Sequence, residues 1–550
     1  MHPAFQIKDN NNQIKFINET FNQIQSKVLQ TALFTNENLL ICAPTSSGKT
    51  NIALLTILHL ISKYRNENNN VINLNKFKII YIAPMKALVK ETVGNFSQRL
   101  SHYNIIVREL SGDVNLTKYE INNTNIIVTT PEKYDIITRK SGDKTFSDKV
   151  QLIIIDEIHL LHDTRGAVLE SIIARTIMNN ENNKENNIRL VALSATLPNY
   201  NDIADFCHVN KKKGLFYFDS SFRPIPLSQI YIGITEKKGI KKLQLINEIT
   251  YNKVYERLTN NKQVIIFTHS RRDTMKTAKF LIEKSIEKNN QNTFKLSSSK
   301  QMEFDEIIKN DTEENLLKNK ELLDIFDYGI GIHHAGMHQS DKKLIEEYFN
   351  NGYLKIIIST ATLAWGINLP ANTVIVKGTQ IYNPEKGSWC ELNFLDIIQM
   401  MGRAGRVGYL DMDKKNNFGE GIIITTYNEL RFYLSLINNN LPIESQLISS
   451  LPDCLNAEIV SGNVSNVFEG ANWLSYTYLF VRMMKNHNLY CISDEIFNND
   501  DLLENWRISL IHASANLLHK NNLIKYNTEN GEFTSTQLGK VSSYYYIKYP

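Results

Sequence analysis

The chain has 550 residues, which is long enough for about three or four domains, each with a core of its own. Its 61 lysines and arginines nearly balance 57 aspartates and glutamates, so no strong overall field attracts polyanions, and nucleic-acid binding would need local patches. The hydrophobic content of 42% excludes wholesale disorder.

Cysteine usage and hydropathy bear on the compartment. The five cysteines are scattered and form no C-x-x-C pair, which excludes a disulfide scaffold or a zinc module and fits a reducing compartment. The first residues carry no apolar core of signal-peptide length, and the longest apolar run, 52–61, is shorter than the roughly 18 residues of a membrane span. We therefore expect a soluble intracellular protein with no membrane partner.

Short apolar runs alternate with helical stretches as far as about residue 215, restart after a proline-containing linker at 218–227, and thin out beyond residue 441. Continuous apolar strands separated by amphipathic helices are typical of a parallel sheet covered on both faces. The expected fold class is α/β, with tandem lobes at 1–215 and 216–440 and a mostly helical domain at 441–550. The expected strands are 39–42, 78–83, 126–129, 152–155 and 190–193 in the first lobe, and 264–268, 329–333, 355–359, 374–377 and 421–425 in the second.

A phosphate-binding loop follows the first expected strand. The segment APTSSGKT (43–50) lies between that strand and a long apolar helix. In a P-loop, backbone N–H groups and the helix N-terminus surround the phosphates, the lysine reaches the β- and γ-phosphates, and the hydroxyl binds Mg²⁺. Ala43 replaces the first glycine of the usual pattern, so the motif alone could match by chance. The predicted ATP-binding residues are Ala43, Pro44, Thr45, Ser46, Ser47, Gly48, Lys49 and Thr50.

Two adjacent acids, Asp156 and Glu157, follow the apolar strand 152–155. The carboxyl edge of an α/β sheet is where ligands bind. ATP hydrolysis needs a carboxylate on Mg²⁺ and a group that polarises the attacking water, and these two residues suit the two roles. The alternative is a solvated turn, but a P-loop in the same lobe favours an ATPase.

Polar motifs end three further strands of the first lobe: APMKAL (83–88), TPEK (130–133) and SAT (194–196). Hydroxyls and free N–H groups at strand ends suit the phosphates of a polynucleotide and require no base readout. Taken singly, each motif could be a turn or a helix cap.

The second lobe contains QMMGRAGR (399–406), in which Arg403 and Arg406 are three residues apart on one helix face. A guanidinium aimed at a γ-phosphate stabilises the charge of the transition state. The alternative is an ordinary pair of surface arginines.

The ordered motifs resemble those of the superfamily 2 DExH-box RNA helicases. They are Gln25 within FNQIQSK, APTSSGKT, APMKAL, TPEK, DEIH, SAT, VIIFTHSR, STATLAWGINLP and QMMGRAGR. Longer stretches, such as LIIIDEIHLLHDTRGAVLE, are similar to the N-terminal cassette of the large spliceosomal helicases of the U-five small nuclear ribonucleoprotein. The resemblance implies two RecA-like lobes followed by a winged-helix domain, ATP and Mg²⁺ as cofactors, and location in the nucleus.

The resemblance also implies a role for individual residues. Those implied in catalysis are Glu157, Asp156, Lys49, Arg403, Arg406 and Gln399. Gln25 would contact adenine, Gly366 and Asn368 would contact the nucleotide from the second lobe, and Thr50 and Asp156 would hold the metal. Ser194 and Thr196 would couple hydrolysis to strand movement. The RNA backbone would lie along Pro84, Lys86, Thr130, Thr268, His269, Arg271 and Thr362.

The segment KGTQIYNPEKGSWCEL (377–392) has the turn chemistry of a β-hairpin, because Asn-Pro and a downstream glycine separate two strand-like ends. Its aromatic residues, Tyr382 and Trp389, could act as a wedge that replaces base stacking at a fork. In the resembling helicases a hairpin at this place separates the strands. The alternative is an ordinary surface hairpin whose aromatic residues pack inward.

Two other features, a histidine pair and a tryptophan, have interpretations simpler than a metal site or base stacking. His333 and His334 look like a metal pair, but no third ligand has sensible spacing, so we favour the role of the HHAGM motif in helicases. Trp365 is expected to pack within its lobe instead of stacking on a base.

The expected function is ATP-dependent unwinding of paired small nuclear RNAs in spliceosome activation, acting on a duplex with a single-stranded tail and assembled with ribonucleoprotein subunits. The alternatives are a related DExH helicase acting on ribosomes or in DNA repair, and a catalytically weak RNA-binding scaffold, which the intact Lys49, Glu157, Arg403 and Arg406 disfavour. The family's cassette continues into a ratchet domain, and its enzyme has a second cassette. We therefore expect either a reduced form or a fragment.

Overall fold

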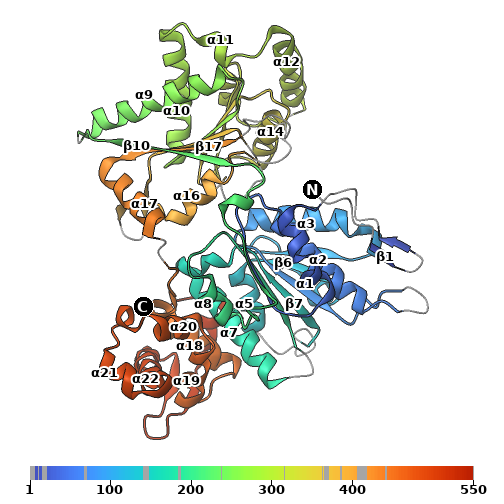
Figure 1. The fold of residues 1–550 in the computed structure, drawn as a ribbon, viewed down its shortest axis with the longest axis vertical. Coiled ribbons are helices and arrows are strands. Elements are labelled where there is room, and N and C mark those ends of the chain that lie inside the picture. The colour runs from blue at the N-terminus through green and yellow to red at the C-terminus, as the bar shows by residue number, and fades with distance from the viewer. Residues whose placement is uncertain are drawn as a thin grey trace. The chain divides into compact units, whose positions relative to one another are not determined.

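A computed structural model of the chain describes residues 7–9, 12–14, 21–66, 71–139, 148–183, 187–236, 238–314, 316–361, 363, 369, 371–383, 387–405, 418–439 and 442–548 (Figure 1). The chain forms two compact units. The first combines Met1–Phe222 with Pro442–Pro550, and the second is Arg223–Leu441.

The first unit contains a parallel sheet of seven strands in the order β5-β6-β4-β7-β8-β3-β9. Its central strands are apolar and buried along their length, as expected for a sheet with helices on both faces. The strands are β3 (Leu39–Cys42), β4 (Lys78–Ile82), β5 (Val107–Leu110), β6 (Ile126–Thr129), β7 (Val150–Ile155), β8 (Arg189–Ser194) and β9 (Leu215–Tyr217). The helices are α1 (Gln23–Phe34), α2 (Lys49–Lys63), α3 (Lys86–Arg99), α4 (Lys118–Asn123), α5 (Pro131–Arg139), α7 (Gly166–Asn182) and α8 (Tyr200–Phe206).

Strand register in this sheet positions the motifs. Cys42 at the end of β3 pairs with Ser194 at the end of β8, and β8 in turn pairs with β7. The P-loop, the SAT motif and the DEIH motif therefore follow the carboxyl ends of three neighbouring parallel strands, at one edge of the sheet.

The second unit contains a parallel sheet of six strands in the order β10-β17-β14-β11-β13-β12. The strands are β10 (Leu227–Ile234), β11 (Val264–Thr268), β12 (Ile330–His333), β13 (Ile356–Thr360), β14 (Thr373–Lys377) and β17 (Gly419–Thr426). The helices are α9 (Gly239–Leu258), α10 (Arg271–Glu287), α11 (Gln291–Phe294), α12 (Ser298–Glu313), α13 (Leu323–Phe326), α14 (Gln339–Asn350), α16 (Phe394–Met401) and α17 (Tyr427–Asn439). An antiparallel pair, β15 (Gln380–Asn383) and β16 (Ser388–Glu391), forms the expected hairpin.

The C-terminal part of the first unit is a helical bundle with a small wing. The wing is the antiparallel pair β18 (Ile524–Tyr526) and β19 (Phe533–Ser535). The helices are α18 (Leu447–Ser461), α19 (Val467–Ser475), α20 (Tyr478–Lys485), α21 (Asp494–Asn499), α22 (Glu504–Lys520) and α23 (Gln537–Tyr545). Its core is built around the buried Trp473 and includes Ala167 of α7. The expected fold class, two α/β lobes followed by a winged-helix domain, is confirmed.

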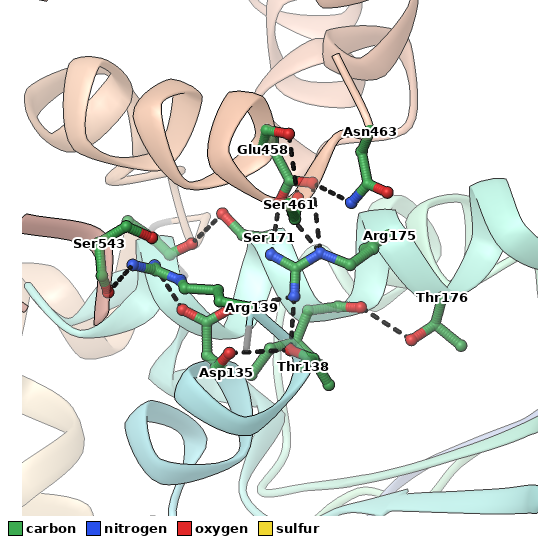
Figure 2. Close-up of polar contacts among 12 residues, drawn as sticks. Asp135, Thr138, Arg139, Ser171, Arg175, Thr176, Glu458, Ser461, Asn463 and Ser543 are labelled. Atoms are coloured by element: carbon green, nitrogen blue, oxygen red, sulfur yellow. Dashed lines mark hydrogen bonds and ion pairs between the residues drawn. The ribbon is translucent and has the colours of Figure 1, made fainter. Parts of the chain in front are cut away.

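A buried charge network joins α5 and α7 to α18 (Figure 2). The guanidinium of Arg175 lies between Asp135, whose Oδ1 is 3.1 Å from Nη1, and Glu458, whose Oε1 is 3.1 Å from Nε. Arg139 contacts Asp135 at 2.5 Å and donates to the carbonyl of Ser543 at 3.1 Å. Buried charges persist in proteins when they are paired in this way, and this network links the C-terminal domain to the first lobe.

Membrane insertion has no candidate among the described helices, none of which is both long and apolar enough to cross a bilayer.

Candidate active site

The loop between β3 and α2 has the geometry of a phosphate cradle. Gly48 has a φ of +80°, which favours glycine, and a Cβ there would lie 2.3 Å from Nε2 of Gln25, so that side chain would also have to move. Lys49 is 9% exposed and its Nζ donates to the carbonyls of Ala43 (3.1 Å) and Pro44 (3.4 Å). The buried hydroxyls of Ser46 and Ser47 have no hydrogen-bond partner among the described residues. Donors gathered at a helix N-terminus suit the phosphates of ATP.

Asn22 and Gln25 hold this loop from the side. The Asn22 side chain donates to the carbonyl of Ser47 at 2.7 Å, and Nε2 of Gln25 donates to the carbonyl of Gly48 at 3.3 Å. The Oε1 atom of Gln25 accepts from the N–H of Asn22 at 3.1 Å, which completes a capping box at the start of α1. The amide of Gln25, expected to contact adenine, is thus engaged with the P-loop. Asn22 had not been singled out, although Asn-x-x-Gln before an apolar run is the signature of such a cap.

The acids occupy the end of β7. Asp156 accepts a hydrogen bond from the Tyr81 hydroxyl at 2.8 Å. Burial, and secondarily the charge of Glu157, raise the pKa of Asp156 to about 7, while Tyr81 and Lys49 act in the opposite direction. Such a carboxylate is stabilised by a nearby cation, and the P-loop Thr50 offers a hydroxyl as a further ligand. These residues therefore fit Mg²⁺.

Glu157 has a strained backbone, with a φ of +53° that non-glycine residues seldom adopt. Its Oε2 atom is buried without a hydrogen-bond partner among the described residues. An unsatisfied carboxylate oxygen held beside a phosphate site is placed to accept a proton from water.

His159 connects the DEIH and SAT motifs. Burial lowers the pKa of its imidazole to about 3, so the ring is neutral. Its Nδ1 atom lies 3.3 Å from Oε2 of Glu157 and 3.5 Å from the amide nitrogen of Ala195. Ser194, whose buried hydroxyl lacks a described partner, accepts a backbone hydrogen bond from Ala43 at 3.1 Å. The DEIH motif, the SAT motif and the start of the P-loop are therefore in contact through His159, Ala195 and Ser194.

The residues expected to follow the RNA in the first lobe lie at two other strand ends. Pro84 is buried, and Lys86 is exposed and paired with Asp113 at 2.6 Å. Thr130 is 8% exposed and precedes the first residue of α5.

In the second unit, a pocket of about 500 Å³ brings Thr268, His269 and Arg271 together with the hairpin. Trp389 is 58% exposed, and its ring centre is 6.3 Å from that of His269 in an edge-to-face arrangement. Trp389, on β16, therefore lines the pocket and is exposed instead of packed inward. The inward-packed alternative does not hold for this residue.

Gln399 and Arg403, expected in catalysis, lie at the end of α16 and just beyond it. Each is 7% exposed, and the carbonyl of Arg403 accepts from the N–H of Ala371 at 3.2 Å. Arg223, which sequence reasoning missed, donates to the carbonyl of Ala404 at 2.6 Å and so supports this segment. His333 lies 3.2 Å from Glu346. The expected site residues outside the described part of the chain are Thr362, Gly366, Asn368 and Arg406, with Trp365.

Comparison with protein families defines the class. The DEAD/DEAH box helicase model matches residues 22–203, the helicase conserved C-terminal domain matches 286–408, and a winged helix-turn-helix domain matches 444–520. The chain therefore contains, in order, regions similar to the two lobes of DEAD/DEAH box helicases and to a winged helix-turn-helix domain.

Individual relatives show which helicases the chain is similar to. The U5 small nuclear ribonucleoprotein 200 kDa helicase of Homo sapiens is 53% identical over 529 residues, which cover 96% of this chain and 24% of that protein. The DExH-box ATP-dependent RNA helicase DExH12 of Arabidopsis thaliana is 53% identical over 531 residues, with the same coverage. The activating signal cointegrator 1 complex subunit 3-like protein of Dictyostelium discoideum is 55% identical over 529 residues, 96% of this chain and 23% of that protein. The chain thus spans about a quarter of the length of these relatives. The resemblance to the DExH-box RNA helicases of the spliceosomal type is confirmed.

Proposed function

We propose that the chain is an ATP-driven RNA helicase that unwinds paired small nuclear RNAs during pre-mRNA splicing, in the nucleus and in association with ribonucleoprotein subunits. Its domains would be the lobes 1–215 and 216–440 and the winged-helix domain 441–550. The observation that supports this most is the meeting of the P-loop, the acids and the SAT motif at the edge of three neighbouring strands.

In this proposal, the P-loop amides and Lys49 bind the phosphates of ATP, and Thr50 and Asp156 hold Mg²⁺. The metal, when bound, neutralises phosphate charge. Glu157 accepts the proton of the attacking water. Gln399, Arg403 and Arg406, with Gly366 and Asn368, serve the nucleotide from the second lobe.

The RNA would follow the strand-end residues of both lobes, with its phosphates contacted by Lys86 and Arg271 and by hydroxyls such as those of Thr130 and Thr268. Such contacts require no base sequence, which suits a motor that moves along RNA. The outward-facing Trp389 supports a role for the β15–β16 hairpin in strand separation.

The Glu157→Gln variant tests the catalytic part. Glutamine keeps the shape of the side chain but cannot accept the proton, so turnover should fall while ATP and RNA still bind. Steady-state hydrolysis measured beside ATP affinity separates this role from a structural one, in which turnover would be retained.

Trimming residues 383–387 to a short turn tests the hairpin. The segment contributes nothing to the ATP-binding residues, so RNA-stimulated hydrolysis should persist while unwinding of a tailed duplex collapses. Unwinding at the parent rate would place strand separation elsewhere.

A second candidate is a DExH helicase of another complex, which the 55% identity to the Dictyostelium protein favours. Sequencing of the RNAs that co-purify with the tagged protein distinguishes these two candidate functions. Small nuclear RNAs would support the splicing role, and ribosomal RNA would contradict it.

A further inference from the structure

The root of the β15–β16 hairpin rests on two acidic side chains that the proposed ATP and RNA contacts do not include. Glu391 ends β16, and Glu429 lies in the first turn of α17. The amide of Gln380, at the start of β15, bridges them: Nε2 is 2.9 Å from Oε1 of Glu391 and 2.5 Å from Oε1 of Glu429. Both residues are only partly exposed, so their contacts are shielded from solvent.

Glu429 receives hydrogen bonds on both of its oxygens. Besides Gln380, the Thr425 hydroxyl donates to Oε2 at 2.6 Å and the N–H of Thr426 donates to the same atom at 3.2 Å. Every partner is a donor, so Glu429 acts as an ionised carboxylate.

A count of the donor hydrogens around Glu391 indicates that this side chain, unlike Glu429, is protonated. A threonine hydroxyl has one hydrogen to donate. That of Thr425 is used on Glu429, so in the 2.8 Å contact between the hydroxyls of Thr379 and Thr425 the hydrogen comes from Thr379. Thr379 then has none left for Oε2 of Glu391, also 2.8 Å away. That contact is satisfied only when Glu391 is protonated and donates.

Tyr433 agrees with this count. Its hydroxyl donates to the carbonyl of Leu392 at 2.8 Å, so it brings no hydrogen to Oε2 of Glu391, which lies 3.2 Å away. Burial, together with the neighbouring carboxylate of Glu429, raises the pKa of Glu391, and hydrogen bonds lower that of Glu429 despite its burial. The titratable groups that the structure places against Glu391 are Glu429 and Tyr433, both on α17.

We propose that Glu391, as a protonated acid, and Glu429, as a carboxylate, are positioning residues that fix the hairpin root to α17 and so hold Trp389 in place for strand separation. This inference rests on the proposed role of the hairpin. The chain of hydrogen bonds from Glu391 through Thr379 and Thr425 to Glu429 ties the first and last residues of the hairpin to β17 and α17. Unwinding needs this brace, whereas hydrolysis does not.

Two matched amide substitutions test the assignment in the full chain. In Glu391→Gln, the new NH₂ replaces the carboxyl O–H and the carbonyl still accepts from Gln380, so hydrolysis and unwinding should both stay near the parent values. In Glu429→Gln, the NH₂ would face donors, so unwinding should fall by roughly tenfold or more with RNA-stimulated hydrolysis retained. Equal effects of the two variants, or parallel loss of hydrolysis, would overturn the proposal.

A pH series provides a second readout that uses only well-packed proteins. Because the raised pKa of Glu391 favours its protonated form, the brace is present below that pKa and is lost as pH rises through it. The ratio of unwinding rate to hydrolysis rate should therefore decline with rising pH in the parent and should decline less in Glu391→Gln. Identical pH profiles would refute the assignment.

Trimming residues 383–387 distinguishes failure of the proposed hairpin role from failure of the proposed role of Glu391 and Glu429. Normal unwinding after trimming would remove the hairpin from the proposed function. Lost unwinding after trimming, together with normal unwinding in Glu429→Gln, would refute the brace alone.

Discussion

Replacing Arg175 with methionine should leave the carboxylate of Glu458 buried without a cation. Glu458 has an exposure of 0%, and its other described partner is the neutral amide of Asn463, at 2.7 Å. Asp135, the second partner of Arg175, keeps its contact with Arg139 at 2.5 Å. The cost of the substitution therefore falls mainly on Glu458.

Removing one partner of a buried ion pair costs about 3–5 kcal/mol, because the remaining charge is neither hydrated nor paired. We expect the free energy of unfolding to fall by about this amount at neutral pH. The Arg175→Met/Glu458→Met double variant should recover most of the loss, since two methionines pack where the pair was.

Urea unfolding followed by tryptophan fluorescence reports on this prediction, because Trp473 is buried in the core of the winged-helix domain. Arg165→Met is the matched control: its Nε lies 2.6 Å from Glu132, but the two side chains are 34% and 32% exposed. A pair so exposed should cost about 0–1 kcal/mol. The reasoning fails if Arg175→Met is no more destabilising than Arg165→Met, or if the double variant is less stable than the single one.

Three further predictions concern the candidate active site. Gly48→Ala should abolish ATP binding, because the Cβ meets Gln25 at 2.3 Å in a left-handed backbone, whereas Gly94→Ala, with nothing within 4 Å, should bind ATP normally; equal affinities would contradict the P-loop geometry. Tyr81→Phe removes a hydrogen bond that lowers the pKa of Asp156, so the acid limb of the pH profile of kcat/KM for ATP should move to higher pH, and an unmoved limb would count against this role for Asp156. Arg406→Ala should reduce turnover by roughly 10³–10⁵ with nucleotide still bound, and undiminished hydrolysis would exclude a transition-state role for this arginine.

The central strands of both sheets could be predicted from the sequence because continuous apolar runs are a local signal of burial on both faces. Strands β5, β9 and β10 were not among the predicted ones. Each lies at an edge of its sheet, where one side is solvated, and their residues include polar ones such as Arg108 and Glu109 of β5. These three edge strands therefore lack the continuous apolar run of a central strand, whereas β12, at the other edge of the second sheet, is buried along its length and was predicted.

The motifs of the candidate site could also be predicted from a local signal, because a P-loop is one continuous segment of sequence. The supporting contacts were not. Tyr81 reaches Asp156 across 75 residues of sequence, and Arg175 reaches Glu458 across 283. Such pairs are set by strand order and by domain docking, which no local pattern encodes. The hydrogen bond from Gln25 to the P-loop likewise depends on how α1 packs beside α2.

The first compact unit is assembled from two stretches of sequence with the whole second unit between them. During synthesis, α7 leaves the ribosome 283 residues before the carboxylate that neutralises Arg175. At typical translation rates this interval lasts roughly 15–60 seconds, during which the face of α7 that receives the winged-helix domain is open to water and to other proteins. All residues of the second unit are synthesised in that time, so its sheet can form before the first unit has its last segment. Ribosome-associated chaperones that bind exposed surfaces can contact this face of α7 during that interval.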